Sequence, residues 1–175
     1  RYLRHRRGWE VATDSSNNNN GPGLSIYSYG APVYNVILDH NSFAWAQDDT
    51  GTWNFVHDVT WQWNVLAEAK NTHTGTSDLK GTNGKGNIHG AEPGNGMALS
   101  NISVHHNFMV NNFMRNPVLS GHGPIEFVNN LIYNYAAFGT QIQNRGGGTH
   151  LNIIGNYYKA GPDTFTKRYA LLVDQ

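Results

Sequence analysis

The sequence has no cysteine, and this absence excludes several kinds of site at once. Without thiols the chain cannot form a disulfide framework, a thiolate zinc site or a cysteine nucleophile. Charge is also scarce and balanced, with 12 Lys and Arg, 12 Asp and Glu, and a formal net charge of zero. This balance gives no overall attraction to nucleic acid or to an anionic membrane, so we expect neither as a partner.

Long apolar runs are missing as well. No segment has the length needed to span a bilayer, and no signal peptide is visible. The chain opens on the strand-like RYLRHR without a starting methionine, so we expect part of a mature protein that lacks its N-terminal rungs or cap. The arginines of this stretch form the one charge run, which is typical of a solvated strand face.

Asparagine, glycine, histidine and aromatic residues are abundant, which favours strands with many turns over a helical bundle. Five segments share alternating apolar residues, then an asparagine, then further apolar or aromatic residues. They are VILDHNSF (36–43), VTWQWNVL (59–66), ISVHHNFM (102–109), IEFVNNLI (125–132) and LNIIGNYY (151–158). Their asparagines are Asn41, Asn64, Asn107, Asn130 and Asn156, separated by 23, 43, 23 and 26 residues. The gap of 43 is close to two periods, and Asn87 lies roughly midway.

A period in the low twenties with short alternating strands predicts a solenoid whose turns, or rungs, stack on one another. We therefore predict an all-β fold, a right-handed single-stranded parallel β-helix, with residues 1–175 forming a single domain of six or so rungs. Asparagine tolerates the left-handed conformation at a sharp corner. Rungs about 4.8 Å apart would also let each amide bond to the next, forming an amide ladder.

Arg115 is the first candidate for chemistry. It lies in NNFMRNPVLSGHG, in the connection that follows the Asn107 repeat, and Pro117 should stiffen this connection and push Asn116 toward an extended conformation. Two interpretations are open: a surface arginine packing over Phe113, or a residue held at a fixed angle for chemistry.

Two further pairs of charged residues lie in connections between repeats. Lys80 and Lys85 belong to the glycine-rich DLKGTNGKGNIHG, where the backbone can approach a ligand closely but the spacing of a phosphate-binding P-loop is absent. Asp48 and Asp49 are adjacent carboxylates, compatible with a Ca²⁺ site or with an ordinary turn.

Histidines and tryptophans offer weaker signals. None of the nine histidines has metal-site spacing, and we interpret His40 and His106, each directly before a repeat asparagine, as structural. Trp61 and Trp63 alternate along one strand, so we expect them to pack on the same face. Other aromatic residues could stack on sugar rings or belong to the core: Trp45, Trp53 and Tyr157.

Five stretches, VILDHNSFAWAQDD, VTWQWNVLAEAKN, KGTNGKGNIHG, ISVHHNFMVNNFMRNP and IIGNYYKAGPDT, together resemble the pectate lyases of polysaccharide lyase family 1, in order over roughly residues 1–165. The family's fold is a parallel β-helix, in agreement with the repeat. The resemblance implies a secreted, monomeric enzyme that cleaves pectate (polygalacturonate), an acidic plant cell-wall polysaccharide, by β-elimination with Ca²⁺. It implies Arg115 as the catalytic base, Lys85 (or Lys80) as the substrate-binding lysine, and Asp48 and Asp49 as metal ligands.

Three positions depart from the family pattern: Val118 replaces a second arginine, Thr52 replaces a further calcium-site acid, and Pro22 aligns near an upstream calcium aspartate. These departures leave two alternatives open. One is a lyase for pectin or another uronan with weak or no Ca²⁺ requirement, and the other is a non-catalytic β-helix that binds acidic glycans.

Overall fold

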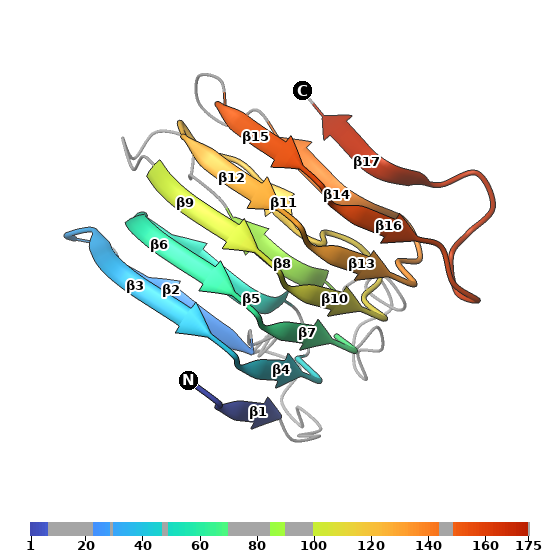
Figure 1. The fold of residues 1–175 in the computed structure, drawn as a ribbon, viewed down its shortest axis with the longest axis horizontal. Helices are drawn as coiled ribbons and strands as arrows, with labels where there is room; N and C mark the ends of the chain where they lie inside the picture. Colours follow the sequence, from blue (N-terminus) through green and yellow to red (C-terminus); the bar gives the residue numbers. More distant parts are fainter. Residues whose placement is uncertain are drawn as a thin grey trace, which may run out of the picture.

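The computed structural model describes residues 1–6, 23–28, 30–46, 49–69, 85–89, 100–143 and 149–174, of which 85–89 are described as backbone only (Figure 1). Strands dominate this part of the chain, and none of it forms a helix long and apolar enough to cross a membrane. The candidate residues Asp48 and Lys80, and also Pro22, lie outside the described residues.

The strands form three parallel sheets. The first sheet contains β1 (Arg4–Arg6), β4 (Ser42–Ala44), β7 (Val65–Ala67), β10 (Phe108–Val110), β13 (Leu131–Tyr133) and β16 (Tyr157–Lys159). The second contains β2 (Leu24–Tyr27), β5 (Asp49–Asn54), β8 (Lys85–His89), β11 (Val118–Leu119), β14 (Phe138–Gln143) and β17 (Tyr169–Asp174). The third contains β3 (Val33–Asp39), β6 (Val56–Gln62), β9 (Ser100–His105), β12 (Ile125–Val128) and β15 (Leu151–Ile154).

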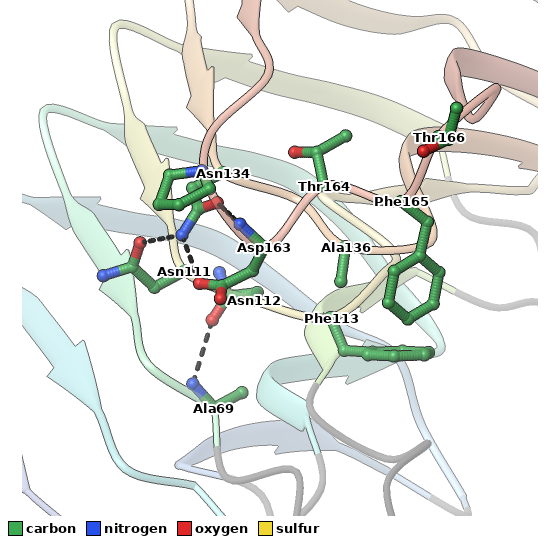
Figure 2. Close-up of a pocket in the computed structure, with 11 residues that line it drawn as sticks. Ala69, Asn111, Asn112, Phe113, Asn134, Ala136, Asp163, Thr164, Phe165 and Thr166 are labelled. Atoms are coloured by element: carbon green, nitrogen blue, oxygen red, sulfur yellow. Dashed lines mark hydrogen bonds between the residues drawn. The ribbon is translucent and has the colours of Figure 1, made fainter.

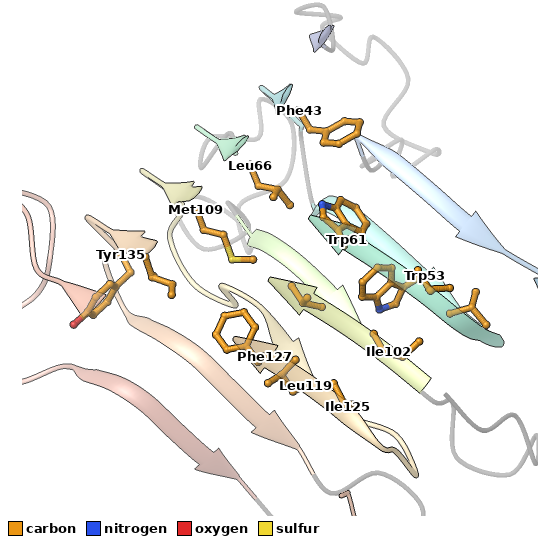
Figure 3. Close-up of a cluster of buried hydrophobic side chains, with 14 residues drawn as sticks. Phe43, Trp53, Trp61, Leu66, Ile102, Met109, Leu119, Ile125, Phe127 and Tyr135 are labelled. Atoms are coloured by element: carbon orange, nitrogen blue, oxygen red, sulfur yellow. The ribbon is translucent and has the colours of Figure 1, made fainter. Parts of the chain in front are cut away.

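Consecutive strands visit the second, third and first sheets in turn, and every strand pairs in parallel with its counterpart one rung away (Figure 1). This winding is a parallel β-helix, so the predicted fold is confirmed. Apolar alternation produces it because inward residues of successive rungs stack in register: Val59, Ile102 and Ile125 pair across the third sheet and are each at most 2% exposed. Around them lies one continuous core, which includes Trp53 and Trp61 with ring centroids 4.8 Å apart (Figure 3).

The predicted asparagine ladder is present. The backbone N–H of Asn41 donates to the side-chain oxygen of Asn64 (2.9 Å), and Asn64 bonds in the same way to Asn107 (2.9 Å). The series continues from Asn107 to Asn130 and from Asn130 to Asn156, each at 2.9 Å. The amides thus replace backbone bonds at the corner where the third-sheet strands end.

The left-handed residue at this corner is not the asparagine, as we expected, but the residue before it. Positive φ angles occur at His40 (55°), Trp63 (55°), His106 (56°), Asn129 (52°) and Gly155 (66°). The physical reason is that the left-handed residue makes the bend, which leaves the asparagine free to turn its amide inward, where it is buried or half-buried.

The gap of 43 residues is one rung step, which corrects the prediction of an intermediate rung at Asn87. Asn64 bonds directly to Asn107, and β6 pairs directly with β9. Asn87 instead lies in β8 of the second sheet, opposite Gly51. The extra residues are therefore an insertion between β7 and β9 that leaves the ladder in register.

Trp61 and Trp63 do not share a face, which is a second correction. Trp61 is fully buried, whereas Trp63 is 51% exposed because β6 ends at Gln62 and the left-handed φ of Trp63 turns its side chain outward. Its ring stacks between those of His40 and His106, at centroid distances of 6.0 and 4.5 Å. The structural role predicted for these two histidines therefore takes the form of ring stacking across rungs.

Candidate functional site

The strand register brings three of the sequence-predicted positions to one corner of the solenoid. Asp49 in β5 is directly opposite Lys85 in β8. Ile88 in β8 is opposite Val118 in β11. Lys85 lies three residues before Ile88, and Arg115 lies three residues before Val118, so the three positions lie on consecutive rungs, where the chain enters the second sheet. We call the turn from the first sheet into the second, where they lie, the site corner.

The backbone around Arg115 is held by the neighbouring rung. Arg115 is half-buried and has a left-handed φ of 60°. Two backbone N–H groups of the following rung donate to the carbonyl of Phe113 (3.1 and 2.8 Å), and the N–H of Asn116 donates to the carbonyl of Gly139 (2.8 Å). The side chain of Asn112 donates to that of Asn116 (3.0 Å), closing the segment on itself. Arg115 therefore lies in a fixed loop, as Pro117 suggested, and the Asn116–Pro117 peptide is cis.

Asp49 is buried, with 5% of its surface exposed. Its carbonyl accepts a hydrogen bond from the N–H of Gly23 (2.8 Å), which joins it to the preceding rung. A carboxylate is the donor type that Ca²⁺ prefers, but the ion takes six to eight oxygens. Among the described residues no group of three acidic or histidine side chains could hold a metal ion, and Asp49 alone would provide too few oxygens for Ca²⁺.

The departures from the family pattern have clear structural positions. Val118 is 2% exposed and pairs with Ile88 and Gln141 in the second sheet, so its side chain belongs to the packed interior. Thr52 is half-buried, and its hydroxyl donates to that of Ser25 (3.1 Å) on the neighbouring strand. Neither side chain contributes a charge to the site corner.

An open groove of about 710 Å³ lies at the same corner (Figure 2). Its walls are residues that follow the first-sheet strands β7, β10, β13 and β16: Ala69, Asn111, Asn112, Phe113, Asn134, Ala136, Pro162, Asp163, Thr164, Phe165 and Thr166. Three of these, Asn111, Asn112 and Phe113, belong to the loop that contains Arg115. The groove thus continues from the Arg115 loop toward the C-terminal rungs.

Sequence reasoning missed this groove, although one signal was available. Asn111 and Asn134 are 23 residues apart, the ladder period, and each directly follows a first-sheet strand. The side chain of Asn134 donates to that of Asn111 (2.8 Å), so the two form a second asparagine contact between rungs. A search for asparagines that repeat with the ladder period would have found this pair.

Comparison with known proteins adds an independent observation. Over 132 residues the chain is 34% identical to the probable pectate lyase C of Aspergillus flavus and 33% identical to that of Aspergillus oryzae, alignments that cover 74% of this chain. Over 170 residues, or 94% of the chain, it is 29% identical to the probable pectate lyase C of Emericella nidulans. The chain is similar to proteins named as pectate lyases.

The chain spans only part of these pectate lyase-like relatives: 27% of the length of the first two and 32% of the third. No family model and no solved structure matches the sequence. The likeness agrees with the parallel β-helix and with the resemblance that the sequence motifs indicate.

Proposed function

We propose that this chain carries part of a polysaccharide lyase site that cleaves pectate by β-elimination, with Arg115 as the base. The observation that carries the proposal is that Asp49 pairs with Lys85 and that Arg115 precedes the next strand of the same sheet, so the three positions lie on consecutive rungs beside an open groove. The names of the relatives, each a probable pectate lyase C, support the same reaction class. Because such a substrate is a plant cell-wall polysaccharide, the proposal includes an extracellular location.

In this reaction Arg115 removes the C5 proton, which is alpha to the uronate carboxylate. The electrons of the C5–H bond form the C4–C5 double bond, and the C4–O bond breaks with its electron pair leaving on the oxygen, which then takes a proton. Lys85 would neutralise the charge that develops on the carboxylate. Calcium, held by Asp48 and Asp49, would add to this neutralisation when bound.

Arginine as a base makes a specific demand, because its pKa ordinarily lies above 12. Neighbouring cations favour the neutral form, and the neutral fraction rises about tenfold for each pH unit below that pKa. We therefore expect the rate to climb from neutral to alkaline pH. A rate that stays flat over this range would argue against Arg115 as the base.

The decisive experiment compares Arg115→Ala with Arg4→Ala, an exposed arginine on β1, on polygalacturonate. Arginine and alanine both carry a Cβ, so replacing one by the other adds no new backbone strain at the left-handed φ of position 115. We expect Arg115→Ala to lose turnover by about 10²–10⁴-fold, measured as absorbance of the unsaturated product, while Arg4→Ala keeps it. An active Arg115→Ala protein with native thermal stability would refute the assignment of Arg115 as the base. Wild-type activity that a chelator does not reduce would refute only the proposed role of calcium.

A second candidate is a non-catalytic β-helix that binds acidic glycans. The observation that favours it is the buried Val118 at the position of the family's second arginine. Calorimetric binding of polygalacturonate by a wild-type protein that forms no unsaturated product would support this alternative.

A further inference from the structure

The groove extends the site corner in one direction. Phe113 and Asn112 form its wall beside Arg115, and Asn134 and Asp163 follow one and two rungs farther on (Figure 2). At about 4.8 Å per rung, this covers roughly 10 Å along the solenoid axis. A linear glycan with one unit at Arg115 would therefore place a neighbouring unit in the groove.

The carboxylate of Asp163 is fixed in this groove by a two-point contact with Asn134. The side-chain amide of Asn134 donates to Oδ2 of Asp163 (2.7 Å), and the backbone N–H of Asp163 donates to Oδ1 of Asn134 (2.9 Å). Asn134 is itself buried, with 5% exposed, and bonds onward to Asn111. Asp163 is exposed, so an oriented carboxylate meets the occupant of the groove.

Asp163 is also the one ionisable residue among the described groove-lining residues. An aspartate is ionised at neutral pH and repels a second carboxylate nearby. The described cations nearby in sequence are Lys159, Lys167 and Arg168, and none of them is among the lining residues. Lys159 lies over the ring of Tyr133 (5.6 Å) and Arg168 over the ring of Phe165 (5.5 Å). The described lining of the groove therefore disfavours a free uronate.

The rest of the lining suits an uncharged sugar. The hydroxyls of Thr164 and Thr166 and the amide of Asn111 can bond to sugar hydroxyls. Phe113 and Phe165 meet edge to face, with centroids 5.7 Å apart, and give an apolar surface. Such a surface can pack against the methyl group of an ester.

We infer that the groove selects an uncharged, methyl-esterified uronate unit next to the unit bound at Arg115, and that Asp163 is the specificity-determining residue that excludes a free carboxylate there. This inference rests on the proposed lyase function. It narrows the substrate from pectate in general to a partly esterified chain.

The test compares wild type with Asp163→Asn on fully de-esterified polygalacturonate and on its partly methyl-esterified form. Asparagine retains an oxygen that can accept the Asn134 bond and loses the charge. We expect kcat/KM on the de-esterified polymer to rise about tenfold, with little change on the esterified one. The matched control is Glu126→Gln, which removes the same charge from an exposed position on the third sheet.

The salt dependence of the substrate preference distinguishes an electrostatic role of Asp163 from a purely structural one, which salt would not affect. Because ionic strength screens exposed charges, the wild-type preference for the esterified polymer should shrink toward that of Asp163→Asn as salt is raised. A substrate ratio unchanged by both salt and substitution would overturn the inference.

Binding affinity for oligomers tests this inference independently of the proposed lyase function. Absence of turnover on either polymer would refute the lyase, whereas calorimetry with de-esterified and methyl-esterified oligomers would still test the groove. Tighter binding of the de-esterified oligomer by Asp163→Asn supports the inference, and equal or undetectable binding by both proteins overturns it.

Discussion

Asn107 illustrates how one side chain replaces the backbone bonds lost at a corner. Its oxygen accepts from the backbone N–H and the side chain of Asn64 (2.9 and 3.1 Å). Its amide donates to the carbonyl of Trp61 (2.8 Å) and to the side chain of Asn130 (3.0 Å). All of this occurs at 2% exposure, where an unmade hydrogen bond is expensive.

We predict that Asn107→Ala lowers the free energy of unfolding by about 3 kcal/mol, because it leaves buried donors and acceptors on two rungs without partners. Urea unfolding followed by circular dichroism measures the change. The control is Asn152→Ala, an exposed asparagine on β15, which should stay within about 0.5 kcal/mol of wild type. Equal stability of the two variants would refute an energetic role for the ladder.

At the residue scale, the sequence predicted a residue's role where that residue recurs at the spacing of the rungs. The ladder asparagines could be predicted because each rung repeats the same side chain at nearly the same spacing. Trp63 could not, because alternation describes a strand and Trp63 lies just past the end of one, at a left-handed φ. Arg115 and its loop were found from the motif, but the hydrogen bonds that hold the loop come from the next rung.

At the scale of the element, the turn between the third and first sheets is defined by its column of left-handed residues. Four of the five carry side chains and tolerate the strain, whereas the last, Gly155, has none. A Cβ at Gly155 would collide with the side-chain oxygen of Asn129 on the preceding rung. Glycine is favoured here because it avoids this contact and also adopts the left-handed φ without strain.

We predict that Gly155→Ala destabilises the protein by about 1–2 kcal/mol, because it adds both the left-handed penalty and a contact with Asn129. Thermal unfolding by differential scanning calorimetry gives the shift. Gly30→Ala serves as the control, since no atom lies within 4 Å of the added Cβ. A lower melting temperature for the control than for Gly155→Ala would contradict this account.

The site corner required the strand pairing as well as the sequence. Asp49 and Lys85 are 36 residues apart, and only the pairing of β5 with β8 makes them neighbours. The gap of 43 was misread for the same reason: period alone cannot distinguish an added rung from a longer connection. The groove combines residues after four different strands, which only the winding of the chain brings together.

At the scale of the whole molecule, several perturbed titrations lie along the third sheet. Burial alone would raise the pKa of Asp39, but hydrogen bonds from Gln62 and His40 and the charge of Arg1 outweigh it and lower that pKa. A hydrogen bond from Asn101 lowers the pKa of Asp58.

A histidine on the same sheet is perturbed in the same direction. Burial lowers the pKa of His105, and the charge of the neighbouring His106 lowers it further, against a smaller opposing effect of Glu126. All three perturbed groups therefore bind protons less readily in the folded chain than in the unfolded one.

The unfolded state then binds more protons between each lowered pKa and its ordinary value, near 6.5 for histidine and 3.9 for aspartate, so stability rises with pH in those windows. We predict that the melting temperature falls as pH drops below about 6.5, and falls further below about 4. Calorimetry from pH 3 to 8 tests this. His105→Gln should weaken the fall in melting temperature below about pH 6.5, and Asp58→Asn should weaken the fall below about pH 4. If neither variant changes the profile, these residues do not cause the pH dependence.

The insertion that leaves the ladder in register has an evolutionary consequence. Because β6 bonds β9 directly across 43 residues, the length of a connection and the geometry of the scaffold are independent variables. Connections at the site corner can then lengthen, shorten or be exchanged between related proteins while the asparagines keep every rung in place. A solenoid of this kind can acquire new glycan preferences by replacing a loop, without refolding its core.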